Sequence, residues 1–189
     1  MIEWPKISGR IWRFLFPSDS GEWLTILRLG LGLQVGLYAW SLRHDWDSLF
    51  ATHGGEAIAR PLSEAILAAE TTLTPRLGWL VTLGAHLGLS EDFVLAFSWL
   101  CLLGAGGCLL VGLLSRPAAC AAWFFYLCSA KSSRLLSYGV DNFTTIGLFY
   151  LMIAPLPDRF ALDWRRLKRK TIDPERQGFH RRVLQIHLC

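Results

Sequence analysis

Long apolar stretches separated by short polar ones make up most of this chain. Four of these stretches are candidates for membrane-spanning helices and cover residues 23–42, 93–114, 118–136 and 140–154. A helix rises about 1.5 Å per residue, so the first stretch would span about 30 Å, the thickness of the hydrocarbon core of a bilayer. The last two are shorter, and we expect them to tilt or to draw the polar turn between them into the membrane. The pattern predicts an all-α fold, a polytopic transmembrane helical bundle.

Shorter amphipathic segments accompany these spans. Residues 61–71 and 76–89 each hold enough Leu, Ile and Ala for a short helix that lies on the outer membrane interface or dips into it. Residues 12–16 fit a further interfacial helix. The chain turns apolar again near its end, so we expect a fifth span that starts near Val183 and continues beyond Cys189 in a longer protein.

End signals predict two helix boundaries. The good N-cap residues before Trp23 place the start of the first long helix near Ser20. The pair Arg116-Pro117 predicts the tight turn between the second and third spans, with Pro117 at the first position of the next helix.

Composition strengthens the membrane interpretation. Of the 189 residues, 52% are hydrophobic and only 18% are charged, whereas a soluble domain carries about 25% charged residues. Most of the nine Trp flank apolar runs, as in the aromatic belt of a membrane interface. The five Cys show no metal-site spacing and four lie inside apolar runs, so we expect no disulfide framework.

The distribution of positive charge predicts the orientation. With the N-terminus in the cytoplasm, the segments on the inner side hold 13 Lys and Arg, and those on the outer side hold 5. Positive charge favours the cytoplasmic side of a membrane. The basic run at residues 165–170 then lies in a cytoplasmic loop near anionic lipid, and we expect a lipid bilayer rather than nucleic acid as its partner.

The polar turn between the third and fourth spans is the best candidate for a site. It holds two cations, Lys131 and Arg134, and one carboxylate, Asp141, at the edge of an apolar region. Charge there is costly unless it is paired or faces a cavity. One interpretation is a solvated outer loop with an ion pair, worth about 0–1 kcal/mol when exposed. The other is a pocket in which the two cations hold an anion or a quinone oxygen.

Arg28 is a second candidate, because it lies inside the first span. It can snorkel to the near interface, or it can meet a carboxylate or an anionic ligand inside the bundle. Beside it, Gly30, Gly32 and Gly36 form a face that lets another helix approach closely. The candidate pocket residues are Arg28, Lys131, Arg134, Tyr138, Asp141 and Asn142.

Other chemistry is not indicated by the sequence. His44, His53 and His86 follow no metal-site spacing, so no metal site is predicted. Neither a phosphate-binding loop nor a nucleophile elbow is present.

Several short motifs together resemble a known family, the HTTM (horizontally transferred transmembrane) domain, which includes the vitamin K-dependent gamma-carboxylase. The motifs are LRLGLG at 27–32, WDSLFATHGG at 46–55, SYGVD at 137–141, FALD at 160–163 and QIHLC at 185–189. They follow the order and spacing of the family over nearly the whole chain. The carboxylase's histidine near the turn between the third and fourth spans has no counterpart in residues 134–138.

The resemblance implies a protein of the bacterial inner membrane with a site open to the outer side. The carboxylase oxidises a reduced quinone with oxygen, and the family's key lysine lies in the span that begins where this sequence stops. Two functions follow as expectations. The protein is a quinone-linked oxidoreductase or modifying enzyme, or it is a non-catalytic membrane partner in the maturation or export of a secreted peptide or redox protein.

Overall fold

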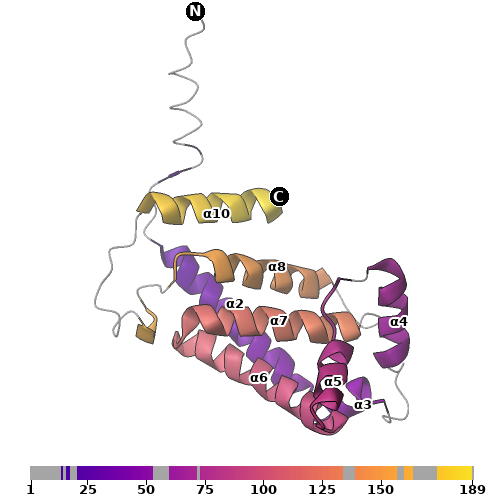
Figure 1. Cartoon of the computed structure of the whole chain (residues 1–189). Helices are drawn as coiled ribbons and strands as arrows, with labels where there is room; N and C mark the ends of the chain where they lie inside the picture. Colours follow the sequence, from indigo (N-terminus) through magenta and orange to yellow (C-terminus); the bar gives the residue numbers. More distant parts are fainter. Residues whose placement is uncertain are drawn as a thin grey trace, which may run out of the picture.

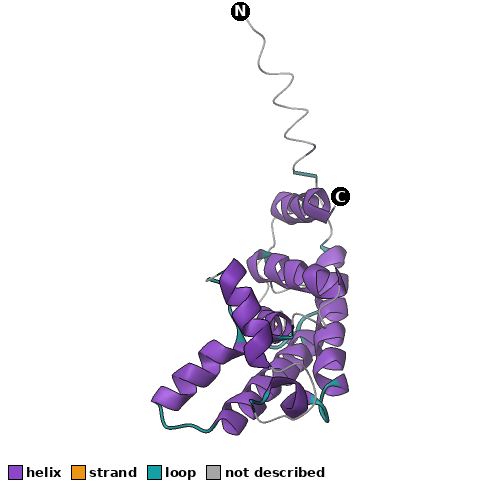
Figure 2. Cartoon of the chain, turned by 90° about the vertical axis from the view of Figure 1, so that its right-hand side faces the viewer, coloured by secondary structure: helices purple, strands orange, loops and turns teal. Residues whose placement is uncertain are grey.

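The computed structural model describes residues 14, 16–17, 21–52, 60–71, 73–133, 139–156, 160–163 and 174–188. Over these residues all regular structure is helical and no strand occurs (Figures 1 and 2). The all-α prediction is therefore confirmed for this part of the chain. The helices are α2 (Glu22–Ser41), α3 (Trp46–Phe50), α4 (Arg60–Glu70), α5 (Leu77–His86), α6 (Glu91–Val111), α7 (Ser115–Ser132), α8 (Gly139–Ile153) and α10 (Pro174–Leu188).

The four helices α2, α6, α7 and α8 form the body of the molecule, and α3, α4 and α5 gather at one end of it (Figure 1). Helix α6 packs between α2 and α7, and α8 packs on α7 and closes back onto α2. Helix α10 lies along α8 at the edge of the bundle. Fully buried apolar side chains fill the centre, among them Leu24, Val35, Leu102, Ala122 and Leu148.

Glycines bring α2 and α6 close together. Of the predicted glycine face, Gly32 and Gly36 lie at this contact, whereas Gly30 is exposed and takes no part in it. A Cβ atom on Gly106 would lie 2.8 Å from the backbone nitrogen of Gly36. A Cβ atom on Gly32 would lie 3.0 Å from the backbone nitrogen of Leu110. Real side chains do not fit at such distances, so the two backbones are in direct contact.

The turn between α6 and α7 lies earlier than the sequence predicts. Gly112 ends α6 in the left-handed conformation, with φ 72°, and Leu113 donates from its backbone nitrogen to the carbonyl of Cys108 at 2.9 Å. This is the Schellman arrangement, for which glycine is favoured. The prediction of a turn at Arg116-Pro117 is wrong, because both residues lie within the first turn of α7. Proline is tolerated there, since the first amide groups of a helix have no partner within the helix.

The start of α2 lies close to the predicted place. The helix begins at Glu22, and its N-cap residue is Gly21, in the left-handed conformation at φ 76° and without a side-chain cap. The predicted short helices near residues 61–71 and 76–89 are confirmed as α4 and α5. Helix α3 lies in the connection between α2 and α4, where the pattern of apolar residues predicts no helix. The interfacial helix expected at residues 12–16 falls largely outside the described residues.

Length and composition single out one helix as able to cross a membrane. Among the described helices, α6 alone is both long and apolar enough. Helix α8 has 15 residues, and α2 contains several polar residues besides Arg28.

Candidate functional site

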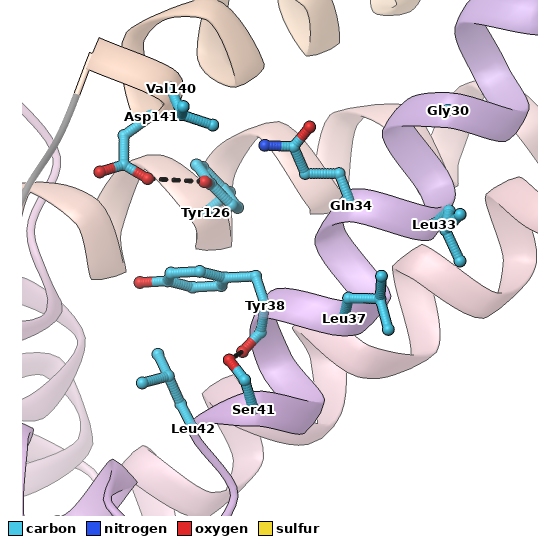
Figure 3. Close-up of a pocket in the computed structure, with 10 residues that line it drawn as sticks. All are labelled: Gly30, Leu33, Gln34, Leu37, Tyr38, Ser41, Leu42, Tyr126, Val140 and Asp141. Carbon is cyan, nitrogen blue, oxygen red and sulfur yellow. Dashed lines mark hydrogen bonds between the residues drawn. The ribbon is translucent and has the colours of Figure 1, made fainter.

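A pocket of about 820 Å³ opens between α2, α7 and α8 (Figure 3). Its wall is mostly apolar, with a few polar groups that converge on the same space, and this combination is typical of sites for small molecules. The lining residues are Gly30, Leu33, Gln34, Leu37, Tyr38, Ser41, Leu42, Tyr126, Val140 and Asp141.

A tyrosine and a carboxylate define the polar end of the pocket. The hydroxyl of Tyr126 donates a hydrogen bond to Oδ1 of Asp141 at 2.7 Å (Figure 3). The ring of Tyr38 packs against that of Tyr126, with centroids 4.7 Å apart. Asp141 lies in the first turn of α8, where the helix dipole favours a negative charge. Tyr126 is buried and Asp141 is half-buried, so the carboxylate is held in place at the edge of the pocket.

Gln34 adds a second polar function to the wall. Its side chain reaches from α2 into the pocket, and its amide group points toward Tyr126 (Figure 3). The amide offers both donors and an acceptor, whereas an ionised carboxylate can only accept. Together, Gln34 and Asp141 offer hydrogen-bond donors and acceptors to a ligand in the pocket.

Arg28 lies at a different place in the bundle. Its side chain is 1% exposed, and Nη1 donates to the carbonyl oxygens of Leu109 and Leu110, the second at 3.1 Å. These carbonyls belong to the last turn of α6, where the helix dipole favours a cation. The side chain thus lies in the interior of the protein and does not snorkel into solvent.

Asp163 lies at the same place, the turn that joins the end of α6 to the start of α7. Its Oδ2 accepts hydrogen bonds from the backbone nitrogen and the hydroxyl of Ser115 at 2.7 and 3.1 Å, and so it caps the start of α7. Its own backbone nitrogen donates to the carbonyl of Gly112 at 3.0 Å. Tyr126 lies eleven residues after Ser115 in α7, about 16 Å along the helix. The junction of Arg28 and Asp163 is therefore separate from the pocket that holds Asp141.

Two further candidates from the polar turn, Lys131 and Asn142, do not line the pocket. Lys131 lies in the last turn of α7, half-buried, where a cation is favoured by the dipole. Asn142 is exposed in the first turn of α8. Arg134 and Tyr138 lie outside the described residues.

Sequence reasoning missed the residues that surround Asp141 in the pocket. Gln34 and Tyr38 are four residues apart in α2, so they share one helix face, and this spacing was a usable signal. No sequence pattern pairs Tyr126 with Asp141, because the contact depends on how α7 and α8 pack.

A second polar cluster fixes α4 to the ends of α6 and α7. The buried Arg60 donates from Nε to the carbonyl of Phe50 at 2.7 Å and from Nη2 to the carboxylate of Glu91. Glu64, one turn after Arg60, accepts a hydrogen bond from the hydroxyl of Ser132 at 2.6 Å. The four-residue spacing of Arg60 and Glu64 indicates their proximity, but not the role of Glu91. These contacts within the protein give the cluster a structural role.

The described residues contain no group of three or more His, Cys, Asp or Glu side chains placed to hold a metal ion. Comparisons of the chain with protein-family models, with curated proteins and with solved structures find no match.

Proposed function

We propose that this protein is a polytopic membrane protein of the HTTM type, and that its pocket between α2, α7 and α8 binds the ring of a quinone or of its reduced form. The observation that carries this proposal is the Tyr126–Asp141 pair, a fixed carboxylate in a largely apolar pocket. In this role the protein is a quinone-linked oxidoreductase or modifying enzyme of the bacterial inner membrane, with its N-terminus in the cytoplasm.

The surface of the long helices supports the membrane placement. Large apolar side chains are more than half exposed on α2, α6 and α8, for example Ile26, Leu37, Phe97, Leu100 and Phe143. A helix of a soluble protein turns such residues inward and covers its outer face with polar ones. Contiguous apolar surface on several neighbouring helices is instead suited to lipid. In this proposal, helices α2, α6, α7 and α8 are the four spans.

The polar groups of the pocket suit a quinone ring. The rings of Tyr38 and Tyr126 offer aromatic surface against which a flat ring can pack. The carboxylate of Asp141 can accept a hydrogen bond from a phenolic hydroxyl, and the amide of Gln34 can donate one to a carbonyl oxygen. A bound quinone would supply two-electron redox chemistry, while these side chains would hold and orient its ring.

Exposed leucines favour a second candidate function. Leu62 in α4 and Leu73, Leu83 and Leu87 in or beside α5 are all more than half exposed. These helices lie together at one end of the bundle (Figure 1). Apolar surface outside the long helices fits a membrane partner that holds a secreted peptide or redox protein without catalysing a reaction.

Quinone binding by the purified protein in lipid nanodiscs tests the proposal. We expect a substituted benzoquinone, in its reduced form, to bind, and Asp141→Asn to lower its affinity about 10- to 100-fold, since a hydrogen bond to a charged group is worth about 1.5–3 kcal/mol. The matched control is Asp92→Asn, which changes an exposed carboxylate at the start of α6 and should leave the affinity unchanged. Absence of binding, together with co-purification of a secreted peptide, would support the partner role instead.

A further inference from the structure

The turn between α5 and α6 is an apolar tip at the edge of the molecule. The two helices meet at one end of the bundle, and the loop between them lies at the periphery (Figures 1 and 2). We call residues 83–90 the α5–α6 tip. Residues 85–90 are all exposed, and Leu83 and Leu87 are 58% and 70% exposed. The described part of the chain therefore does not bury any residue of this turn.

The composition of the tip does not suit contact with water. Residues 77–90 contain no Asp, Glu, Lys or Arg. A soluble protein places charged and polar side chains on a surface as exposed as this one, and a concentrated apolar surface marks a site of interaction. Charged residues return at Glu91 and Asp92, where α6 begins. The tip is therefore a surface that a partner covers, and its charged neighbours set how far that surface extends.

Hydrogen bonds within the tip satisfy the amide groups of its turn. Gly88 has the left-handed conformation, with φ 75°, and its nitrogen donates to the carbonyl of Ala85 at 3.1 Å. The nitrogens of Leu87 and Leu89 both donate to the carbonyl of Gly84 at 2.9 Å. Backbone groups in lipid need partners within the protein, because lipid tails offer none. The three consecutive amides at 87–89 meet this condition.

Lipid covers such a tip better than another protein does. A peptide groove or a second helix covers one side of a turn, whereas fluid lipid surrounds it. The apolar surface also continues along α6, where Phe93, Phe97 and Leu100 are each more than half exposed. In the proposed membrane placement this face of α6 contacts lipid, and α6 begins at the outer interface. The tip therefore lies at the same interface and extends a surface that contacts lipid.

We propose that the α5–α6 tip inserts into the outer leaflet of the membrane and that its partner is phospholipid. Leu83, Leu87 and Leu89 then lie at the boundary between the headgroups and the acyl chains, about 5–10 Å deep, as in interfacial helices. The proposal rests on the membrane placement proposed above and not on the site of the quinone ring. It removes Leu83 and Leu87 from the surface that a secreted peptide could bind.

Spin labels on single cysteines in the full chain, reconstituted in phosphatidylcholine nanodiscs, test this inference. The five native cysteines are replaced, and Leu87→Cys places the label in the tip. The matched control is Asp47→Cys, an exposed position in α3 at the same end of the bundle. Oxygen collects in lipid, whereas a nickel chelate stays in water. We expect the label at position 87 to collide more often with oxygen than with the chelate, and the label at position 47 to show the reverse. Both positions are exposed, so neither change removes a core contact.

Each other result at position 87 overturns the inference. More frequent collisions with the chelate would place the tip in water, and few collisions with either reagent would mean that protein covers it. A third label, at Leu100→Cys on the exposed face of α6, separates this inference from the proposed function. If position 100 is in lipid while position 87 is in water, the membrane placement holds and the insertion of the tip fails. If position 87 is in lipid while position 100 is in water, the tip inserts but α6 does not span the membrane. Both labels in water would overturn both.

Discussion

At the scale of single residues, charged side chains complete the helix ends at the turn between α6 and α7. Arg28 donates to the carbonyls of Leu109 and Leu110 at the end of α6, and Asp163 accepts from Ser115 at the start of α7. Helix ends leave backbone groups without partners within the helix, and burying these groups unsatisfied is costly. The two side chains therefore allow the turn between α6 and α7 to be covered by protein.

Replacing Arg28 tests its structural role at the end of α6. We expect Arg28→Met to lower the free energy of unfolding by about 1–3 kcal/mol, because it removes a donor from two carbonyls in a buried environment. The thermal midpoint in detergent measures the loss. Arg43→Met is the control, since Arg43 is an exposed arginine just after the same helix, and its replacement should change stability by less than about 0.5 kcal/mol. Equal midpoints for the two variants would show that Arg28 does not support the junction.

The sequence identified Arg28 and Asp141 as notable but not their partners. A cation or a carboxylate inside an apolar stretch needs compensation, and this need is visible in the sequence. Arg28 meets carbonyls that are 81 and 82 positions away, and Asp163 meets a residue 48 positions away. Such contacts depend on helix packing, which no local spacing encodes.

At the scale of elements, the packing of α2 on α6 depends on which glycines face the contact. Gly106 lies against the backbone of Gly36, whereas Gly104, half a turn away in α6, faces open space. Glycine is a poor helix former, so its presence at Gly106 reflects the close approach of the two helices. Apolar runs predicted where the long helices lie, but the end of α6 was set by Gly112 and its hydrogen bonds, which made the predicted turn at Pro117 wrong.

Two alanine substitutions distinguish the glycine that faces α2 from the glycine that faces open space. Gly106→Ala should destabilise the protein by about 1–3 kcal/mol, because a Cβ atom 2.8 Å from backbone forces α2 and α6 apart. Gly104→Ala should leave stability unchanged or raise it by up to about 1 kcal/mol, because alanine favours the helix and has space there. Thermal unfolding of both variants gives the comparison. Equal destabilisation by both would contradict the close contact.

At the scale of the whole molecule, clusters of charged and polar side chains lie at the two ends of an apolar body. One end holds Arg28, Asp163 and Arg116, whose Nη2 donates to the carbonyl of Ala154 at 3.2 Å beyond α8. The other end holds Arg60 and Glu91 beneath α4. A molecule that crosses a bilayer needs its charged groups at the two interfaces and apolar surface between them. This arrangement favours the membrane placement more strongly than the composition of any single helix.

Labelling of single cysteines tests the orientation that this placement requires. In a variant whose five native cysteines are replaced, Asn142→Cys at the start of α8 should react with a membrane-impermeant reagent in intact cells. Arg176→Cys, in the first turn of α10, should react only after the membrane is permeabilised. Both positions are exposed, so the difference measures sidedness and not burial. The reverse pattern would place the N-terminus outside, and labelling of both in intact cells would rule out a membrane crossing by α8.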